Sequence, residues 1–445
     1  VLNLYSYTYD SVGNLTAETN NGQTTHYTYD ANGRISSVTE PNGKITEYEY
    51  DQAGNRSVKR EVFTGTEPIT TYYTYDASNR LIIQENDLGD VIYYNYDANG
   101  NLISESGSIT TVSGSALKWN VIDESENKPP ETVSGSAIGF DVNKLVVGLT
   151  DENSTKDTVS GPAIKLVIPN KVNTIIDKTY QYDGFNRLIE YRQGDTRAYY
   201  TYNAEDYRVR KSVFSLDDVL DVLYFYEGDK VLLEADISGY ITARNTYGTH
   251  LVSRTVNGNT YYYLYNSHGD VVMLIDTNTG LQAVTYRYDA FGTIINQTGY
   301  ADNFITYAGY QYDKESGLYY VNSRYYNSDN GRFLTEDIYR GQLSDPLSLN
   351  RYTYCHNNPV RYTDPSGYGI FSTLLVSFAI GAVIGGVVEY TRQKITNKKG
   401  NVDWNAVAYE AVVGGVTGMI GGGLGASAAK TTAKTVAKTT AKSVA

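Results

Sequence analysis

The sequence YTYDSVGNL, residues 7–15, decides the fold, because the same pattern returns along the chain. It reads Tyr-x-Tyr-Asp-x-x-Gly, followed by Asn or Arg and then Leu, with an alternating run on each side. Further copies are YTYDANGRI (27–35), YEYDQAGNR (48–56), YTYDASNRL (73–81), YNYDANGNL (94–102), YQYDGFNRL (180–188), YRYDAFGTI (286–294) and the degenerate YTYNAEDYRV (200–209). A short repeat with alternation on both sides predicts one β-hairpin per copy.

Each part of the motif has a role in such a hairpin. Tyr7 and Tyr9 point to one face, because side chains on a strand repeat every two residues. Asp10 caps the turn by accepting a hydrogen bond from the N–H two residues on, and Gly13 supplies a positive φ. A calcium loop needs several oxygen ligands, so we interpret these aspartates as turn caps. Stacked hairpins bury a continuous tyrosine layer, which predicts a long, spiralling antiparallel sheet.

Composition narrows the class of protein. The net charge of −13 opposes binding of the hairpin region to nucleic acid, whose phosphates it would repel. A single cysteine, Cys355, excludes an internal disulfide framework. The four histidines show no spacing that pairs two on one face, so we predict no metal site and no cofactor. The chain has no initiator methionine and begins within a repeat, so we expect it to be a fragment.

The tyrosines stop between the fifth and sixth clear copies. Residues 103–178 contain a different repeat, TVSGSALKW (111–119), TVSGSAIGF (132–140) and TVSGPAIKL (158–166). Short β-branched runs separated by acidic stretches predict a small β-rich insert. We find no ligand set and no nucleophile in it, and interpret it as surface decoration.

A second distinctive stretch is GRFLTEDIYRGQLSDPLSLNRYTYCHNNPVRYTDPSGYG, residues 331–369. Together with RYDAFG (287–292), SGLYYVNSRYYN (316–327) and the Tyr-Asp repeats, it resembles the RHS/YD-repeat family, which includes WapA-like polymorphic toxins, teneurins and the C component of bacterial toxin complexes. The resemblance implies that the hairpins coil into a hollow shell. It also implies that this shell encloses the chain's own C-terminal segment, a cargo with no signature in this sequence, for which an immunity protein is a candidate partner.

The same resemblance implies self-cleavage by two carboxyl groups, one acting as acid and the other as base. Carried onto this chain, Asp337 and Asp364 form the pair, Arg332 is a nearby orienting cation, and the scissile bond is Tyr368–Gly369. Asp345 is an alternative partner for Asp364. The other interpretation is that Asp337 and Asp364 only cap turns.

The residues after Gly369 are apolar and spaced by glycine. Residues 370–388 carry no charge and are long enough for a membrane span, and residues 406–429 carry only Glu410. We expect a glycine-rich α-helical hairpin, either in contact with a membrane or packed inside the shell. The tail places Lys430, Lys434, Lys438 and Lys442 four residues apart.

The sequence therefore predicts a mainly β protein with a Tyr-Asp repeat shell, a small β insert and a C-terminal helical segment. The expected domains are residues 1–102, 103–178, 179–285, 286–369 and 370–445. We expect a secreted or cell-surface bacterial protein, and the preferred function is a toxin shell that releases a C-terminal effector. One alternative is a non-enzymatic adhesin whose repeats bind carbohydrate, and another is a shell that never cuts itself.

Overall fold

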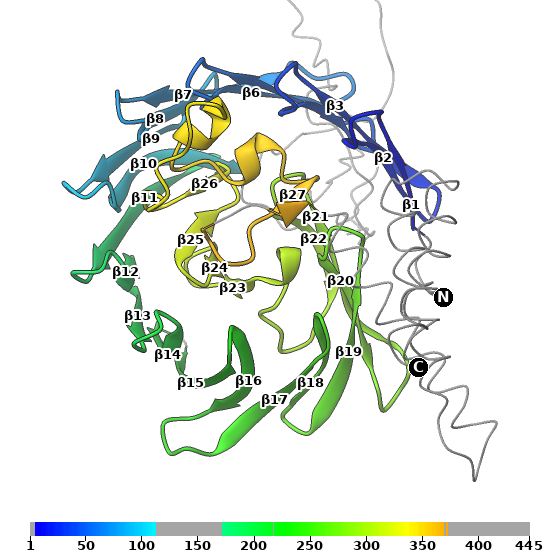
Figure 1. The fold of residues 1–445 in the computed structure, drawn as a ribbon, viewed down its shortest axis with the longest axis vertical. Coiled ribbons are helices and arrows are strands. Elements are labelled where there is room, and N and C mark those ends of the chain that lie inside the picture. The colour runs from blue at the N-terminus through cyan, green and yellow to red at the C-terminus, as the bar shows by residue number, and fades with distance from the viewer. Residues whose placement is uncertain (1–4, 113–170, 217, 369–370, 373–445) are drawn as a thin grey trace, which may run out of the picture.

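The computed structural model describes residues 5–112, 171–216, 218–368 and 371–372. Twenty-two antiparallel strands form one sheet, in which each strand pairs with the next along the chain. They are β1 (Tyr5–Tyr9), β2 (Leu15–Asn20), β3 (Gln23–Tyr29), β4 (Ile35–Thr39), β5 (Ile45–Tyr50), β6 (Arg56–Val62), β7 (Ile69–Tyr75), β8 (Leu81–Asn86), β9 (Val91–Tyr96), β10 (Leu102–Val112), β11 (Lys171–Tyr182), β12 (Leu188–Gln193), β13 (Thr196–Tyr202), β14 (Arg208–Phe214), β15 (Val219–Glu227), β16 (Lys230–Ala235), β17 (Ile241–Tyr247), β18 (Leu251–Val256), β19 (Asn259–Tyr265), β20 (Val271–Asp276), β21 (Gln282–Tyr288) and β22 (Ile294–Gly299). The sheet curls into a wall around a smaller inner unit (Figure 1).

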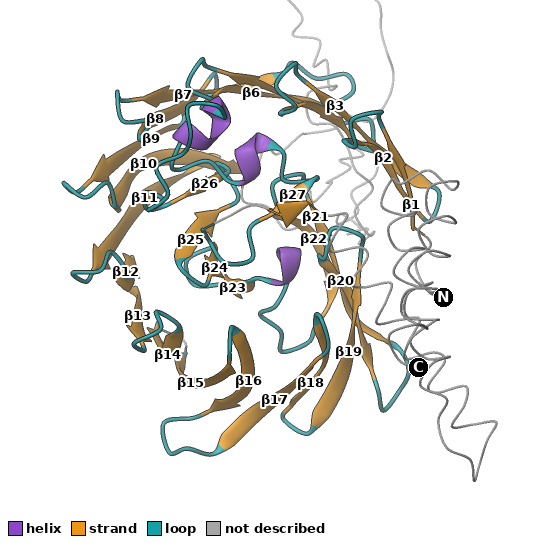
Figure 2. Cartoon of the chain, viewed as in Figure 1, coloured by secondary structure: helices purple, strands orange, loops and turns teal. Residues whose placement is uncertain are grey.

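We call the inner unit, residues 301–368, the plug. Its elements are the 3-10 helices η2 (Tyr307–Gly309), η3 (Pro346–Leu349) and η4 (Cys355–Asn357), the sheet β23 (Gln311–Asp313), β24 (Leu318–Val321), β25 (Arg324–Asn327) and β26 (Arg332–Phe333), and strand β27 (Tyr362–Thr363), which pairs with β28 (Phe371–Ser372) beyond the plug. Helix is confined to these short turns in the part of the chain that the structure describes (Figure 2). The predicted spiralling antiparallel sheet is therefore confirmed.

The hairpin turns have the predicted chemistry. Asp10 Oδ1 accepts hydrogen bonds from the N–H groups of Val12 at 3.0 Å and Asn14 at 2.8 Å. Gly13 has φ +87°, and Asn79 and Asn186 take the same conformation at φ +62° and +63°. The aspartate consumes its acceptors on its own turn, so its role as a turn cap is confirmed.

The second tyrosine of the motif fastens each hairpin to the one before it. The Tyr50 hydroxyl donates to the Ile35 carbonyl at 2.7 Å, and the Tyr202 hydroxyl donates to the Leu188 carbonyl at 2.6 Å. The same bond is made by Tyr29, Tyr75, Tyr182, Tyr226, Tyr265 and Tyr288. In every case the acceptor is the residue directly after the preceding turn, which phenylalanine could not reach with a donor.

Replacing Tyr50 by phenylalanine should therefore lower the free energy of unfolding by about 1 kcal/mol, because the buried Ile35 carbonyl loses its partner. Urea unfolding measures this effect. Tyr93→Phe is the control, since that side chain is 51% exposed on the outer face. An equal loss in both variants would show that the hydroxyl bond does not hold the hairpins together.

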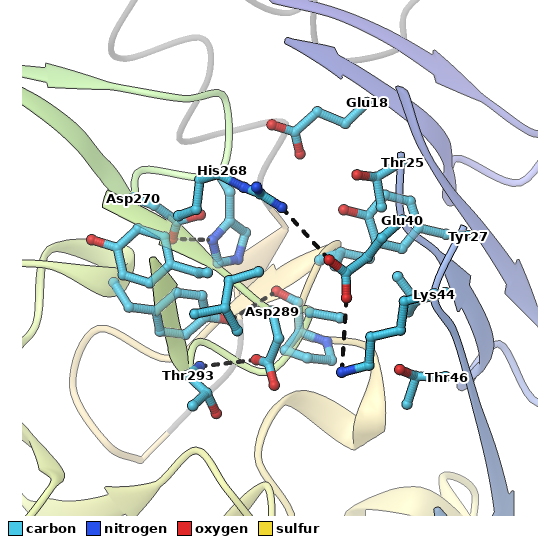
Figure 3. A pocket seen from close by; sticks show the side chains of 18 of the residues that line it. Glu18, Thr25, Tyr27, Glu40, Lys44, Thr46, His268, Asp270, Asp289 and Thr293 are labelled. Atoms are coloured by element: carbon cyan, nitrogen blue, oxygen red, sulfur yellow. Dashed lines mark hydrogen bonds and ion pairs between the residues drawn. The ribbon is translucent and has the colours of Figure 1, made fainter. Parts of the chain in front are cut away.

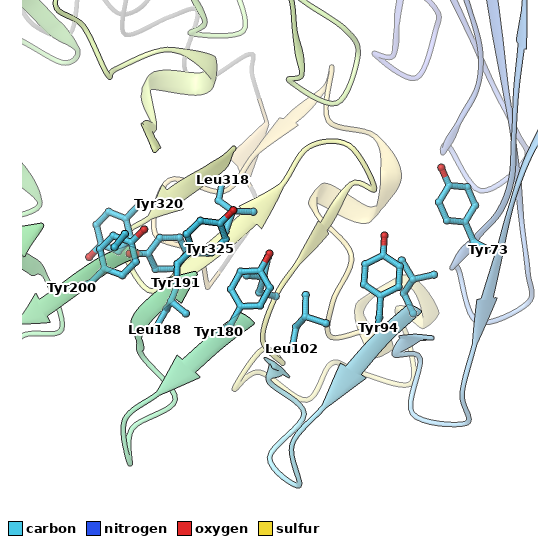
Figure 4. Close-up of a cluster of buried hydrophobic side chains, with 13 residues drawn as sticks. Tyr73, Tyr94, Leu102, Tyr180, Leu188, Tyr191, Tyr200, Leu318, Tyr320 and Tyr325 are labelled. Atoms are coloured by element: carbon cyan, nitrogen blue, oxygen red, sulfur yellow. The ribbon is translucent and has the colours of Figure 1, made fainter. Parts of the chain in front are cut away.

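The core lies between the inner face of the wall and the plug. Neighbouring tyrosines alternate between the two faces, as with Tyr73, which is 7% exposed, and Tyr72, which is 48% exposed. Figure 4 shows Tyr94, Tyr180 and Tyr191 of the wall beside Leu318 and Tyr325 of the plug. The tyrosine layer is therefore buried against the plug, which packs inside the curve of the wall.

Because successive strands run in opposite directions, all turns that carry the Asp motif lie at one edge of the wall. The connection from β10 to β11 lies at the other edge. Residues 103–112 and 171–178, the ends of the predicted insert, are long strands of the wall. The remainder of that insert, and both predicted helices at 370–388 and 406–429, lie outside the described residues. The described residues contain no helix that is long and apolar enough to cross a membrane.

Candidate functional site

The last described turn of the plug, residues 363–368, is held on the hairpin formed by β24 and β25. We call it the exit turn. The Ser323 hydroxyl donates to the Ser366 carbonyl at 2.8 Å, and the Asn322 amide donates to the Pro365 carbonyl at 3.1 Å. Gly367 has φ +76°, and a Cβ there would lie 2.3 Å from Ser323 Oγ. The exit turn is thus fixed over its whole length and closely packed at Gly367.

Arg324 of β25 gathers the predicted carboxylates onto this turn. Its Nη2 lies 2.8 Å from Asp337 Oδ2 and 3.4 Å from Asp364 Oδ2, and its Nε donates to the Gly367 carbonyl. The side chains of Arg324 and Asp364 are 5% and 3% exposed, whereas Asp337 is 15% exposed. Burial lowers the pKa of Arg324, against the attraction of the two carboxylates, but a guanidinium stays charged at neutral pH.

The structure therefore brings Asp337 and Asp364 to one place and puts a cation between them. Asp337 also caps its own turn, because its Oδ1 accepts the N–H of Tyr339 at 2.8 Å. The N–H of Asp364 donates to the Tyr310 hydroxyl at 2.9 Å. Tyr368 is 44% exposed, and Gly369, the other half of the predicted scissile bond, lies outside the described residues.

Arg332 is found at a different place. Its Nη1 donates to Asn55 Oδ1 at 3.1 Å, its Nη2 donates to the Asn79 carbonyl, and its guanidinium lies over the Tyr75 ring. It joins the plug to two turns of the wall, and Arg324 occupies the position beside the carboxylates. Asp345, the alternative partner, accepts the N–H of Ser348 on its own carbonyl at 3.1 Å in the η3 turn.

Sequence reasoning missed Arg324, although it lies within the quoted stretch SGLYYVNSRYYN. The only signal was its place in a tight hairpin of aromatic residues, where Val321 pairs with Arg324 across the turn. An arginine in a buried strand needs counter-charges. Nothing in the local pattern says that these come from residues 13 and 40 positions further on.

A second group of ionisable residues lines a cavity of about 550 Å³ between the first hairpins and strands β20 to β22. In Figure 3, Glu18 of β2 lies across this cavity from His268 and Asp270. Burial, reinforced by the negative charge of Asp270, raises the pKa of Glu18 to about 7. Lys44 lies 2.7 Å from Glu61 Oε1, so the cations on this side are paired.

His268 is a structural residue. Its Nδ1 lies 2.7 Å from Asp270 Oδ1 and its Nε2 lies 3.2 Å from the Tyr362 carbonyl. Both neighbours are acceptors, so only the imidazolium satisfies them together. Burial alone would lower the pKa of His268, but the Asp270 carboxylate outweighs it and raises the pKa. Among the described residues, no three or more His, Cys, Asp or Glu are grouped so as to hold a metal ion.

A curled wall of Tyr-Asp hairpins closed around a plug from the same chain defines a YD-repeat shell. The RHS Repeat family matches residues 9–44 and 29–67, and the Teneurin YD-shell family matches residues 240–360. The chain belongs to the RHS/YD-repeat family.

Individual relatives include proteins with toxic activities. The chain is 38% identical over 211 residues to the tRNA3(Ser)-specific nuclease WapA of Bacillus spizizenii, covering 45% of this chain and 9% of that protein. It is 38% identical over 85 residues to the toxin protein Tse5 of Pseudomonas aeruginosa, covering 18% of this chain and 6% of that protein. A crystal structure of TcdB2-TccC3-Cdc42 matches 78% of this chain and 21% of that chain, at 17% identity and a TM-score of 0.37. The chain thus spans about a tenth of the length of the first two.

Proposed function

We propose that the chain is part of the shell of a bacterial polymorphic toxin, which encloses a C-terminal effector and releases it by cutting the chain after Tyr368. The observation that carries this proposal is Arg324, which binds Asp337, Asp364 and the carbonyl of Gly367 at once. It places two carboxyl groups and the backbone next to the exit turn in a buried site. The relatives named as a nuclease and a toxin favour this function over an adhesin.

The proposed chemistry is hydrolysis of the Tyr368–Gly369 peptide bond. One carboxylate takes a proton from water, the water oxygen adds to the Tyr368 carbonyl carbon, and the bond to the Gly369 nitrogen breaks as the other carboxyl group protonates the departing amine. Contact with Arg324 favours the ionised form of both groups. The carboxyl group that donates must therefore leave the guanidinium, and Asp337, the more exposed of the two, is the one we assign to that step.

This function places the protein outside the cell or at the bacterial surface, with its own downstream segment as partner and an immunity protein to protect the producer. Membrane contact through residues 370–388 and 406–429 and carbohydrate binding by the wall remain predictions from the sequence.

Asp364→Asn should abolish processing of the full chain, because the variant has one carboxylate where the reaction needs two. Gel electrophoresis with N-terminal sequencing of the fragment measures this, and the wild-type fragment should begin at Gly369. Asp345→Asn is the matched control and should be processed like the wild type, since Asp345 lies in the separate η3 turn. Processing that is unchanged in Asp364→Asn, or absent from the wild type, would remove the self-cleavage mechanism.

A further inference from the structure

The last residue of the hairpin turn alternates along the first six Asp motifs. It is Asn14, Arg34, Asn55, Arg80, Asn101 and Arg187 in chain order. All six turns share the same aspartate cap and lie at the same edge of the wall, so backbone geometry does not explain the alternation. The hydrogen-bond partners of the six side chains do differ.

The asparagines bind the plug. Asn55 is 1% exposed, and its Nδ2 donates to Asp51 Oδ2 and to Asn79 Oδ1, both at 2.9 Å. Its Oδ1 accepts from Arg332 Nη1 at 3.1 Å and from Asn350 Nδ2 at 2.6 Å, which fills every hydrogen-bonding position of the amide.

The other two asparagine turns repeat this pattern of contact with the plug. Asn14 Oδ1 accepts from Arg361 Nη1 at 2.9 Å and from Asn358 Nδ2 at 3.2 Å. At the Asn101 turn, the carbonyl of Gly100 accepts from the Tyr352 hydroxyl at 2.8 Å, and the N–H of Leu102 donates to the Leu334 carbonyl.

The arginines turn the other way, along the wall. Arg34, Arg80 and Arg187 each hold their own turn aspartate, with Nη2 2.6 Å from its Oδ2. Each guanidinium then lies over the second tyrosine of the following motif, at 4.5 Å for Arg34 over Tyr50. Some of their turns still offer a backbone carbonyl to the plug, as Gly33 does to Asn358, but none of these three side chains has a printed bond to it.

We propose that this one residue decides what each turn binds: asparagine makes the turn a docking site for the plug, and arginine fastens the hairpin to the next one. The physical reason is the chemistry of the plug face. It presents donors, namely Arg332, Asn350, Asn358 and Arg361, and only asparagine offers them an acceptor while donating to its own aspartate. An arginine has five donors and no acceptor, and would also repel Arg332 or Arg361.

The experiment uses Asn55→Arg in the full chain and needs no self-cleavage. Cys355 is the only cysteine, lies in the plug and is 1% exposed, so its rate of alkylation by a maleimide reports how often the plug opens. We expect this rate to rise at least about tenfold, which corresponds to about 1.4 kcal/mol of lost docking energy. Far-UV circular dichroism should stay unchanged, which separates release of the plug from unfolding of the wall.

Arg80→Asn is the control at the same position of the next turn. It removes the ion pair with Asp76 and the stacking on Tyr96, and should leave the alkylation rate within about twofold of the wild type. If Asn55→Arg does not fold, Asn14→Arg decides the matter at the first turn. An unchanged rate in a folded asparagine variant, or an equal rise in Arg80→Asn, would overturn the proposal.

Discussion

Replacing Asp313 by asparagine should lower the free energy of unfolding by about 3–5 kcal/mol, among the largest effects expected of any single substitution in this chain. Asp313 lies in β23 of the plug and is 1% exposed. It accepts from Arg208 Nη2 at 3.0 Å and from Lys211 Nζ at 2.9 Å, both on strand β14 of the wall. Burial alone would raise the pKa of Asp313, but these two cations outweigh it and lower the pKa.

The expected cost arises because asparagine leaves two buried cations facing Glu315 alone. Arg208 is fully buried and would keep only its bonds to Gln311 and the Tyr325 hydroxyl. Chemical denaturation measures the loss. Asp221→Asn is the matched control, since it removes an ion pair with Arg210 of the same strand, where the arginine is 39% exposed, and should cost less than about 1 kcal/mol. Equal losses in the two variants would show that the plug is not anchored here.

The same strand shows where sequence reasoning reaches its limit. Alternation predicts that Arg208 and Arg210 share a face. A register shift beside the turn, between the pairs of Thr201 and Tyr202, places Arg208 inside and leaves Arg210 in contact with solvent. The bulge belongs to the turn and not to the strand pattern, so the repeat predicts the hairpin but not which arginine is buried.

Local chemistry could be predicted and distant partners could not. The Asp10 cap, the positive φ of Gly13 and the tyrosine layer all follow from residues within one repeat. The resemblance pointed to Asp337 and Asp364, which the structure brings to one guanidinium. Arg332 was assigned to the wrong neighbourhood, because its partner Asn55 lies 277 residues away in a turn that looks like its neighbours.

Replacing Glu18 by glutamine should stabilise the protein at pH 8 by about 2–3 kcal/mol and have little effect near pH 4. Glu18 is the acidic residue that faces Asp270 and His268 across the cavity at the closure of the wall (Figure 3). Its pKa is raised to about 7, from about 4.3 in an unfolded chain, because burial and Asp270 disfavour the charged form. Folding therefore costs free energy above pH 7, and that cost disappears as the pH falls and the carboxyl group takes up its proton.

Glutamine resembles the protonated acid at every pH, so the difference between the variant and the wild type should grow between pH 4 and pH 8. Denaturation midpoints at several pH values measure this. Glu61→Gln is the control with the opposite sign, because Lys59 and Lys44 outweigh burial and lower the pKa of Glu61. That variant should be destabilised at pH 8, where Glu61 pairs with both cations. A Glu18→Gln variant that is less stable than the wild type at pH 8 would mean that Glu18 has a cationic partner on the described or remaining chain, and the wall would then close by attraction at the point where we expect repulsion.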